Sequence, residues 1–315
     1  MMRKLVQSVL LVAVLLAAAC HGGGGGGAAD AGPDTGTPDG QAVDAGDAGG
    51  AGERSLMYIG PHPDDEFYAA PLLGHYCVDQ GWSCTFVVAT EGEGGNCGLP
   101  QGCQPDLATV RRAEMQASAA IFGATLHHLD LGDNGKYEPY PGDVEEVLAL
   151  WVNRAGGAEE LVALFAHRIA TAAPDVLYVM DPRHGHYCHP SHRALGEVVL
   201  QAVAELGEAA PETRLLAGRG VSGPGEFGFV PFVAEDPTLQ HFDATTLSPA
   251  LSAESWLFVL RVLQAHASQF PQAGDVDDST FLGVSDANKR IYWVPLSGVV
   301  QDDPLYEDLC APSTY

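Results

Sequence analysis

The sequence predicts an α/β domain in which helices cover both faces of a mostly parallel sheet. Short segments such as 56–60 and 176–180 are apolar without a break, which is typical of strands buried on both sides. Segments with the apolar spacing of helices separate these runs. An alternation of strands and helices favours a parallel sheet in a layered fold. From about residue 215 the pattern is less regular.

The expected elements follow one another from residue 56. Apolar runs predict strands at 56–60, 84–90, 126–131, 176–180 and 290–294. Helical spacing predicts helices at 66–77, 107–122, 159–173, 190–206 and 252–267. Ligands of such folds collect at the carboxyl ends of the strands, so the residues that follow each strand are the first candidates for a site.

The N-terminal end is expected to direct export. Arg3 and Lys4 precede an apolar run over 5–19, which is too short to span a bilayer as a stable helix. The run ends in alanines followed by Cys20, which predicts a signal peptide over 1–19 and a lipid on that cysteine. An ordinary secretory signal is the alternative. We therefore expect a lipoprotein of the cell membrane or outer membrane that faces the periplasm or the cell exterior.

Residues 20–54 are expected to form a flexible linker. They are rich in glycine, alanine and aspartate and contain no aromatic residue, so they cannot bury enough apolar surface to offset the entropy lost on ordering. Residues 55–315 then form one large domain, or one domain with an appendage, by the usual length of roughly 100 to 200 residues per domain.

The charge excludes some partners. The chain carries 41 acidic and 15 basic residues, which gives a formal net charge of −26. Nucleic acid is excluded as a partner because its phosphates would be repelled. A neutral or cationic ligand fits better, no protein partner is implied, and membrane contact is expected through the lipid anchor alone.

Six further cysteines permit three disulfides in an exported chain. They are Cys77, Cys84, Cys97, Cys103, Cys188 and Cys310. Fifteen pairings are possible, but the short separations favour the first with the second and the third with the fourth, which leaves the last two for each other. Metal binding by these thiols is the alternative, and the absence of any Cys-x-x-Cys pair speaks against it.

Metal-ligand side chains follow two of the expected strands. His62-Pro-Asp-Asp-Glu66 comes directly after the first strand, and four histidines follow the fourth strand: His184, His186, His189 and His192. A catalytic zinc takes three protein ligands, typically imidazoles and a carboxylate, and keeps a fourth position open. The joint placement of both clusters after strands of one sheet therefore predicts a shared metal site.

The spacing allows a ligand set without completing it. One tight turn can present both His62 and Asp65 to one ion, and His189 or His192 would supply the third ligand. Asp64 would then lie close to the open position. Taken alone, the first cluster could be a capped helix start, and a histidine-rich loop could be solvated.

Several short motifs occur in order between residues 58 and about 270. They are His-Pro-Asp-Asp-Glu at 62–66, Thr-Glu-Gly-Glu-Gly-Gly at 90–95, Arg111 with Glu114, Asp133, His-Pro-Ser-His at 189–192 and His-Ala-Ser-Gln at 266–269. In this order they resemble the LmbE-like or PIG-L family of zinc-dependent deacetylases, which remove acetyl groups from conjugates of N-acetylglucosamine. The resemblance implies a Rossmann-like fold and one zinc ion per chain.

The resemblance also implies roles for individual residues. The zinc ligands would be His62, Asp65 and His192. Asp64 would be the general base, and His189 the general acid and oxyanion stabiliser. The implied reaction is metal-assisted hydrolysis of a linear amide C–N bond, which removes an N-acyl group, acetyl by preference, from an amino-sugar conjugate.

Three further residues are implied to contact sugar hydroxyls: Arg111, Asp133 and Glu93. The chain departs from the family at Ser191, where an aspartate is usual. Two other functions remain open from the sequence: a zinc amidase of a non-sugar acyl amide or thiol conjugate, and a non-catalytic surface protein that binds carbohydrate on the same scaffold. The aromatic residues of the last third, Trp256, Phe258, Tyr292 and Trp293, are expected to pack in the core, with a sugar platform as the alternative.

Overall fold

The computed structural model describes residues 54–135, 142–183, 185–207, 213–219, 222–225, 228–231, 240–283 and 289–296. The expected signal peptide, Cys20 and the linker up to residue 53 lie outside these ranges, as do His184 and Cys310. Within the described ranges, no helix combines the length and the apolar character that crossing a membrane requires.

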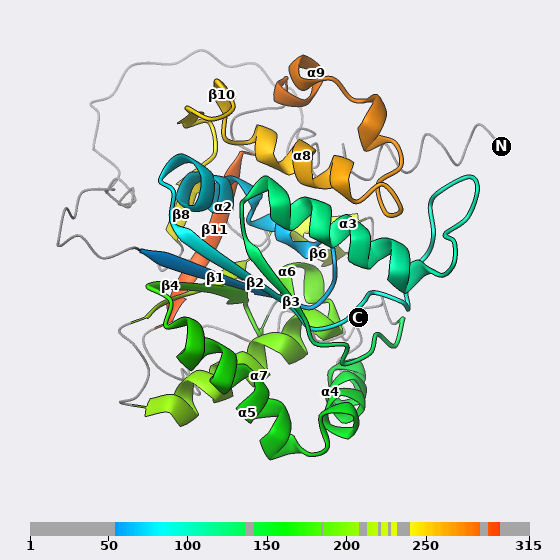
Figure 1. Ribbon diagram of the computed structural model, residues 1–315, viewed down its shortest axis with the longest axis vertical. Coiled ribbons are helices and arrows are strands. Elements are labelled where there is room, and N and C mark those ends of the chain that lie inside the picture. The colour runs from blue at the N-terminus through cyan, green and yellow to red at the C-terminus, as the bar shows by residue number, and fades with distance from the viewer. Residues whose placement is uncertain are drawn as a thin grey trace, which may run out of the picture.

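A seven-stranded sheet forms the centre of the domain (Figure 1). Its strands, in spatial order, are β3 (Thr125–His128), β2 (Ser83–Val88), β1 (Ser55–Gly60), β4 (Val176–Met180), β5 (Arg214–Arg219), β11 (Arg290–Leu296) and β8 (Gln240–Asp243). The first five run parallel, and β11 is antiparallel to both β5 and β8. The expected mostly parallel sheet is confirmed.

Helices cover both faces of this sheet (Figure 1). One face carries α2 (Ala70–Leu73), η2 (Gly74–Asp79), α3 (Leu107–Ile121) and α8 (Leu257–Ala265). The other face carries α4 (Gly142–Ala155), α5 (Ala158–Ala172) and α7 (Pro190–Leu206). Shorter elements are η1 (Asp65–Tyr68), α6 (Gly185–Cys188), η5 (Ala273–Asp275), α9 (Asp278–Leu282) and the two-stranded pairs β6 (Ser222–Gly225) with β7 (Gly228–Pro231) and β9 (Leu247–Ser248) with β10 (Ala253–Glu254).

The central strands are apolar throughout because both of their faces are buried. Along β1, Tyr58 packs into the core under α3 and α8, whereas Met57 and Ile59 pack into the core under α5 and α7. All three side chains are buried, and burying one large apolar side chain contributes about 1.5–3 kcal/mol. Trp256, Phe258 and Trp293 also lie buried in the core under α3 and α8, as expected, whereas Tyr292 is only partly buried and packs against His241.

Two helical predictions differ from the structure, and one helix was not predicted. The helix expected over 66–77 is divided into η1, α2 and η2, because Pro71 lacks an amide proton and is tolerated only in the first turn of a helix. The helix expected over 252–267 begins only at Leu257, since β10 and a turn precede it. Helix α4 was not predicted, although the spacing of Val144, Val147 and Trp151 is helical.

Two expected disulfides are confirmed, Cys77–Cys84 and Cys97–Cys103. Cys188 is also disulfide-bonded, and its expected partner lies outside the described residues. The first disulfide joins η2 to β2 within the core, and the second closes part of the loop that follows β2.

Replacing Cys77 and Cys84 together by serine is expected to lower the free energy of unfolding by roughly 2 kcal/mol, because the closed loop is short. Tm should fall by about 4–8 °C in a calorimetric scan. The matched control replaces Cys97 and Cys103, which are separated by a similar length but are more exposed, so no buried hydroxyl is left behind. The control should therefore lose less Tm than the variant with buried serine hydroxyls at positions 77 and 84. A larger loss of Tm in the control would contradict this prediction.

Candidate active site

The two clusters of ligand-type residues meet at one edge of the sheet. Strands β1 and β4 are parallel neighbours, with Ile59 opposite Val179, so the residues that follow them emerge side by side. The ring centroids of His62 and His192 lie 5.5 Å apart. His189 lies 4.9 Å from His62 and 4.6 Å from His192, measured between ring centroids.

These three buried histidines form a possible metal site. One ring nitrogen of each of His62, His189 and His192 lies within 4.8 Å of the others. The Asp65 carboxylate joins two of them, with Oδ2 2.9 Å from His62 Nδ1 and Oδ1 3.1 Å from His192 Nε2. Ligand atoms 2.0–2.2 Å from a tetrahedral ion lie about 3.4 Å from one another. The donor types and their spacing therefore fit a divalent cation such as zinc.

The electrostatics of this cluster favour a charged carboxylate. Burial raises the pKa of Asp65, but His192 and His62 outweigh burial and hold that pKa well below its usual range. Burial lowers the pKa of His62, yet the Asp65 carboxylate and its hydrogen bond leave it above the usual value. The backbone amide of His62 also donates to Asp65 Oδ2 over 2.9 Å, which fixes the orientation of the carboxylate.

Asp64 has a strained backbone. Its φ of 131° lies in the region that favours glycine, and such strain costs about 1–3 kcal/mol for another residue. Arg111 Nη2 lies 2.9 Å from Asp64 Oδ1 and also donates to the Pro63 carbonyl. Burial raises the pKa of Asp64 to about 6, against the opposing charge of Arg111. A carboxyl group with this pKa can take up and release a proton near neutral pH.

His189 begins helix α7 as its N-cap, and its Nδ1 accepts a hydrogen bond of 3.2 Å from the backbone amide of Ser191. A neutral imidazole that accepts at Nδ1 carries its proton on Nε2. Burial and the neighbouring His192 and His62 hold the pKa of His189 well below its usual value. The backbone amide of Ser191 therefore fixes the orientation of this imidazole.

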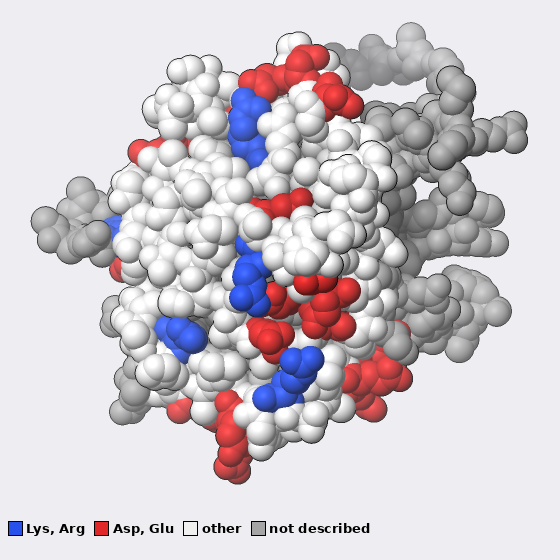
Figure 2. Space-filling view, turned by 45° about the vertical axis from the view of Figure 1, so that its right-hand side comes forward, with Lys and Arg blue, Asp and Glu red and all other residues white. Residues whose placement is uncertain are grey.

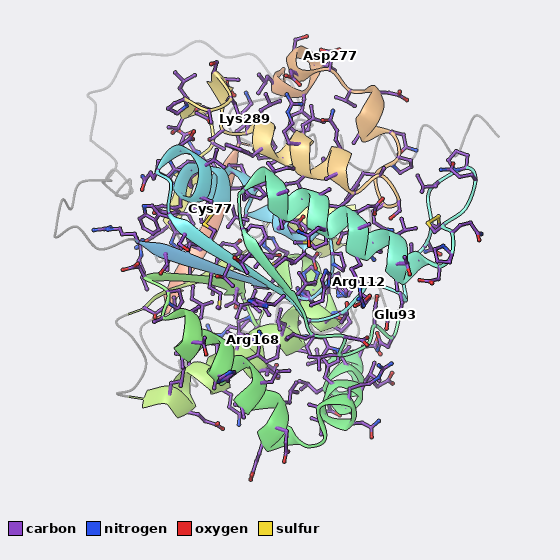
Figure 3. All side chains as sticks on the ribbon, in the orientation of Figure 1. Cys77, Glu93, Arg112, Arg168, Asp277 and Lys289 are labelled. Atoms are coloured by element: carbon purple, nitrogen blue, oxygen red, sulfur yellow. A yellow bond between two sulfur atoms is a disulfide. The ribbon has the colours of Figure 1, made fainter. Side chains whose placement is uncertain are left out.

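The predicted sugar contacts take two different positions. Arg111 is 3% exposed and donates to the Gly92 carbonyl in addition to its contacts around Asp64, so it lies beneath the carboxylate. Asp133 is partly buried and Glu93 is exposed, and the Asp133 amide donates to Glu93 Oε1 over 3.1 Å. Figure 3 shows Glu93 beyond the end of the sheet, near Arg112 at the start of α3. Hydroxyl contacts by these residues stay a prediction.

Gly94 allows the loop after β2 to approach Asp133. A Cβ atom at this position would lie 2.4 Å from the Gly135 amide nitrogen and 2.9 Å from Asp133 Cγ, closer than packed atoms can come. Replacing Gly94 by alanine is therefore expected to displace Asp133 and to lower kcat/KM by about 10-fold or more, through KM more than kcat. Gly274→Ala, whose Cβ meets nothing within 4 Å, is the control, and equal kinetics in both variants would exclude a role for this approach.

Glu66 and His266 form a second buried pair beside the first cluster. His266 Nε2 lies 2.5 Å from Glu66 Oε1, and neither side chain is exposed. Burial lowers the pKa of His266, but the Glu66 charge outweighs burial and raises it above the usual value. No local sequence pattern predicts this contact, because Glu66 and His266 are 200 residues apart.

Charged side chains near these elements are paired. Arg112 contacts Glu91, and the Arg154 guanidinium lies 3.7 Å from Asp130. Figure 2, which turns the right-hand side of Figure 1 forward, shows basic side chains next to acidic ones on a mostly uncharged surface. This pairing gives the surface little net attraction for an anionic ligand.

A family model and several curated proteins match this chain. The model, described as "PIG-L: GlcNAc-PI de-N-acetylase", matches residues 57–203. The chain is 28% identical over 172 residues to 1D-myo-inositol 2-acetamido-2-deoxy-alpha-D-glucopyranoside deacetylase 2 of Catenulispora acidiphila, which covers 51% of this chain and 54% of that protein. The chain thus spans about half the length of that relative.

Two further proteins are similar over longer stretches. The 1D-myo-inositol 2-acetamido-2-deoxy-alpha-D-glucopyranoside deacetylase of Acidothermus cellulolyticus is 26% identical over 251 residues, which cover 70% of this chain and 81% of that protein. The crystallised N,N'-diacetylchitobiose deacetylase of Pyrococcus horikoshii is 17% identical, with a TM-score of 0.44 and coverage of 73% of each chain.

Proposed function

We propose that this chain hydrolyses the N-acyl group of an amino-sugar conjugate. The match to the PIG-L family model and the similarity to curated deacetylases support this function. The preferred acyl group is acetyl, and the sugar is an N-acetylglucosamine derivative. The observation that carries the proposal is the convergence of Asp64, Asp65 and the imidazoles of His62, His189 and His192 where β1 and β4 end.

His62, Asp65 and His192 are the proposed ligands of one zinc ion. Asp65 completes the set better than His189, because its carboxylate already contacts the other two ligands and because the Nδ1 atom of His189 is engaged by the Ser191 amide. When bound, zinc would supply a Lewis acid that polarises the acyl carbonyl and lowers the pKa of a water molecule toward about 7.

Asp64 is the proposed general base. It accepts the proton of the attacking water, and Arg111 keeps its carboxylate in place without filling both oxygens. Because burial brings the pKa of Asp64 to about 6, the carboxylate is mostly ionised at neutral pH and can still hold a proton briefly.

His189 is the proposed oxyanion stabiliser and general acid. Its Nε2–H can donate to the acyl oxygen as negative charge develops there. The Nε2 proton passes to the departing nitrogen as the C–N bond breaks, and the proton that Asp64 took from the water replaces it, so both side chains end as they began. Asp133 and Glu93 would then contact sugar hydroxyls at the rim.

Acetate release from a panel of acetylated compounds tests this proposal. The folded domain, from residue 53 onward, should release acetate from N-acetylglucosamine conjugates such as diacetylchitobiose and N-acetylglucosaminyl inositol. Release from simple acyl amides or acylated thiol conjugates alone would favour a different amidase. If the zinc-loaded protein binds the sugars but releases no acetate, the chain is a non-catalytic carbohydrate-binding protein.

We further propose that the domain is exported and held at a membrane by a lipid on Cys20, with 20–54 as its linker. Metabolic labelling with a fatty acid tests this directly. The full chain should take up the label and Cys20→Ser should not, whereas equal labelling of both would contradict the anchor.

A further inference from the structure

A buried polar chain connects the end of α8 to the backbone of Asp64. Glu66 Oε1 lies 2.5 Å from His266 Nε2 and accepts a hydrogen bond of the same length from Ser118 Oγ. Glu66 Oε2 accepts the backbone amide of Asp64 over 3.1 Å. The side chains of Glu66, Ser118 and His266 are fully buried. Both oxygens of one carboxylate therefore have fixed partners.

The partners of Glu66 come from different elements. Glu66 lies in η1, Ser118 lies in α3 and His266 is the C-cap of α8. The backbone amide of His266 donates to the Val262 carbonyl over 3.1 Å. Burying a carboxyl group is costly unless its oxygens are hydrogen-bonded. Three elements thus hold the carboxylate in one orientation, with its second oxygen directed at Asp64.

The amide of Asp64 needs such a restraint. At a φ of 131° the residue does not keep its conformation by its own preference. Arg111 holds the carboxylate end through Oδ1, and Glu66 holds the amide end. The strained backbone of Asp64 lies between the contact with Arg111 and the contact with Glu66. The direction of the Asp64 carboxylate therefore depends on both contacts.

We propose that Glu66 is a positioning residue for Asp64, and that His266 acts through Glu66 by keeping its carboxylate oriented. This inference rests on the proposed function, in which Asp64 accepts the proton of the attacking water. Neither Glu66 nor His266 contacts the substrate in this role. Misplacement of a reacting group by about 1 Å can cost about 100-fold in rate, so a contact of this kind has a measurable effect.

Steady-state kinetics of Glu66→Ala test the proposal. We expect kcat to fall by about 10- to 100-fold, KM to stay within about 3-fold and bound zinc to stay unchanged. Glu66→Gln should recover most of the loss, because its carbonyl oxygen can still accept the Asp64 amide. His266→Ala should show a smaller loss, and the double variant should be no slower than Glu66→Ala, since both residues act in one chain of contacts.

Glu114→Ala is the matched control. Glu114 also lies on α3 and accepts two hydrogen bonds from the region after α8, from the Ser268 amide over 2.7 Å and from its hydroxyl over 2.6 Å. The Glu114→Ala variant should have a lower Tm, and its kcat should change by no more than about 2-fold. An equal loss of kcat in Glu66→Ala and Glu114→Ala, or no loss in Glu66→Ala, would overturn the inference. Should Glu66→Ala fail to fold, His266→Ala takes its place in this comparison.

A crystal structure of Glu66→Ala separates this inference from the proposed function. Asp64 should leave its positive φ and its contact with Arg111 in the variant. If the wild-type protein releases no acetate from any compound, the proposed function fails, and the conformation of Asp64 still decides the inference. An unchanged Asp64 would overturn it even in an active enzyme.

Discussion

Asp64→Asn is expected to keep its bound metal and to lose kcat by about 100-fold or more. Asparagine has the shape of aspartate and can keep the contact of its side-chain oxygen with Arg111 Nη2, which is 2.9 Å in the wild-type protein. It cannot accept the proton of a water molecule, so hydrolysis lacks its base. Acetate release under substrate saturation, together with metal analysis of the same preparation, measures both effects.

The matched control is Asp130→Asn. Asp130 also has a positive φ, of 51°, and lies near an arginine, Arg154, but its side chain is exposed and is not among the proposed site residues. This variant should be as active as the wild type. Unimpaired turnover in Asp64→Asn would remove Asp64 from the role of base, and loss of metal in Asp64→Asn would show that it contributes to binding the ion.

His192→Ala is expected to lose bound zinc and nearly all activity. The imidazole is fully buried, and its Nε2 lies 3.1 Å from Asp65 Oδ1, so the substitution removes one of the three proposed ligands. Loss of a Lewis acid removes several kcal/mol of transition-state stabilisation, which corresponds to about 1000-fold in kcat/KM. Metal analysis after dialysis and a test of reactivation by added zinc measure the loss.

Two companion variants distinguish the possible ligand sets. Asp65→Ala should lose zinc, whereas His189→Ala should retain it and lose turnover, because His189 is the proposed proton donor. The opposite pattern would favour the three histidines as the ligand set. His127→Ala, on the edge strand β3 where the imidazole contacts Arg168 over 3.2 Å, is the control and should keep both metal and activity.

Most of the sheet could be predicted because its central strands are buried on both faces. Of the five parallel strands, β1, β2 and β4 contain unbroken or nearly unbroken apolar runs, whereas β3 consists of threonine, leucine and two histidines; all four were located from the sequence. The remaining strand of this set, β5, has arginine at both ends, Arg214 and Arg219, which interrupts the pattern. The antiparallel position of β11 between β5 and β8 depends on tertiary packing, which no local pattern encodes.

The candidate site was predictable where its residues follow strands. His62, Asp65, His189 and His192 lie where the strand ends directed attention, and the structure brings them together. The contact of Glu66 with His266 was not predictable, because it depends on how α8 packs against η1 and α3. The contact of Arg111 with Asp64 has the same origin, since a helix and a turn must first be placed side by side.

The pairing of β1 with β4 has a consequence for the order of events in folding. Tyr58 and Tyr178 are opposite one another although 120 residues separate them. Before this long loop closes, the proposed metal ligands that follow β1 are far from those that follow β4. Loops of this length are expected to close late in folding. Capture of an ion at the shared position, and with it any chemistry, is thereby delayed until the middle of the molecule has formed.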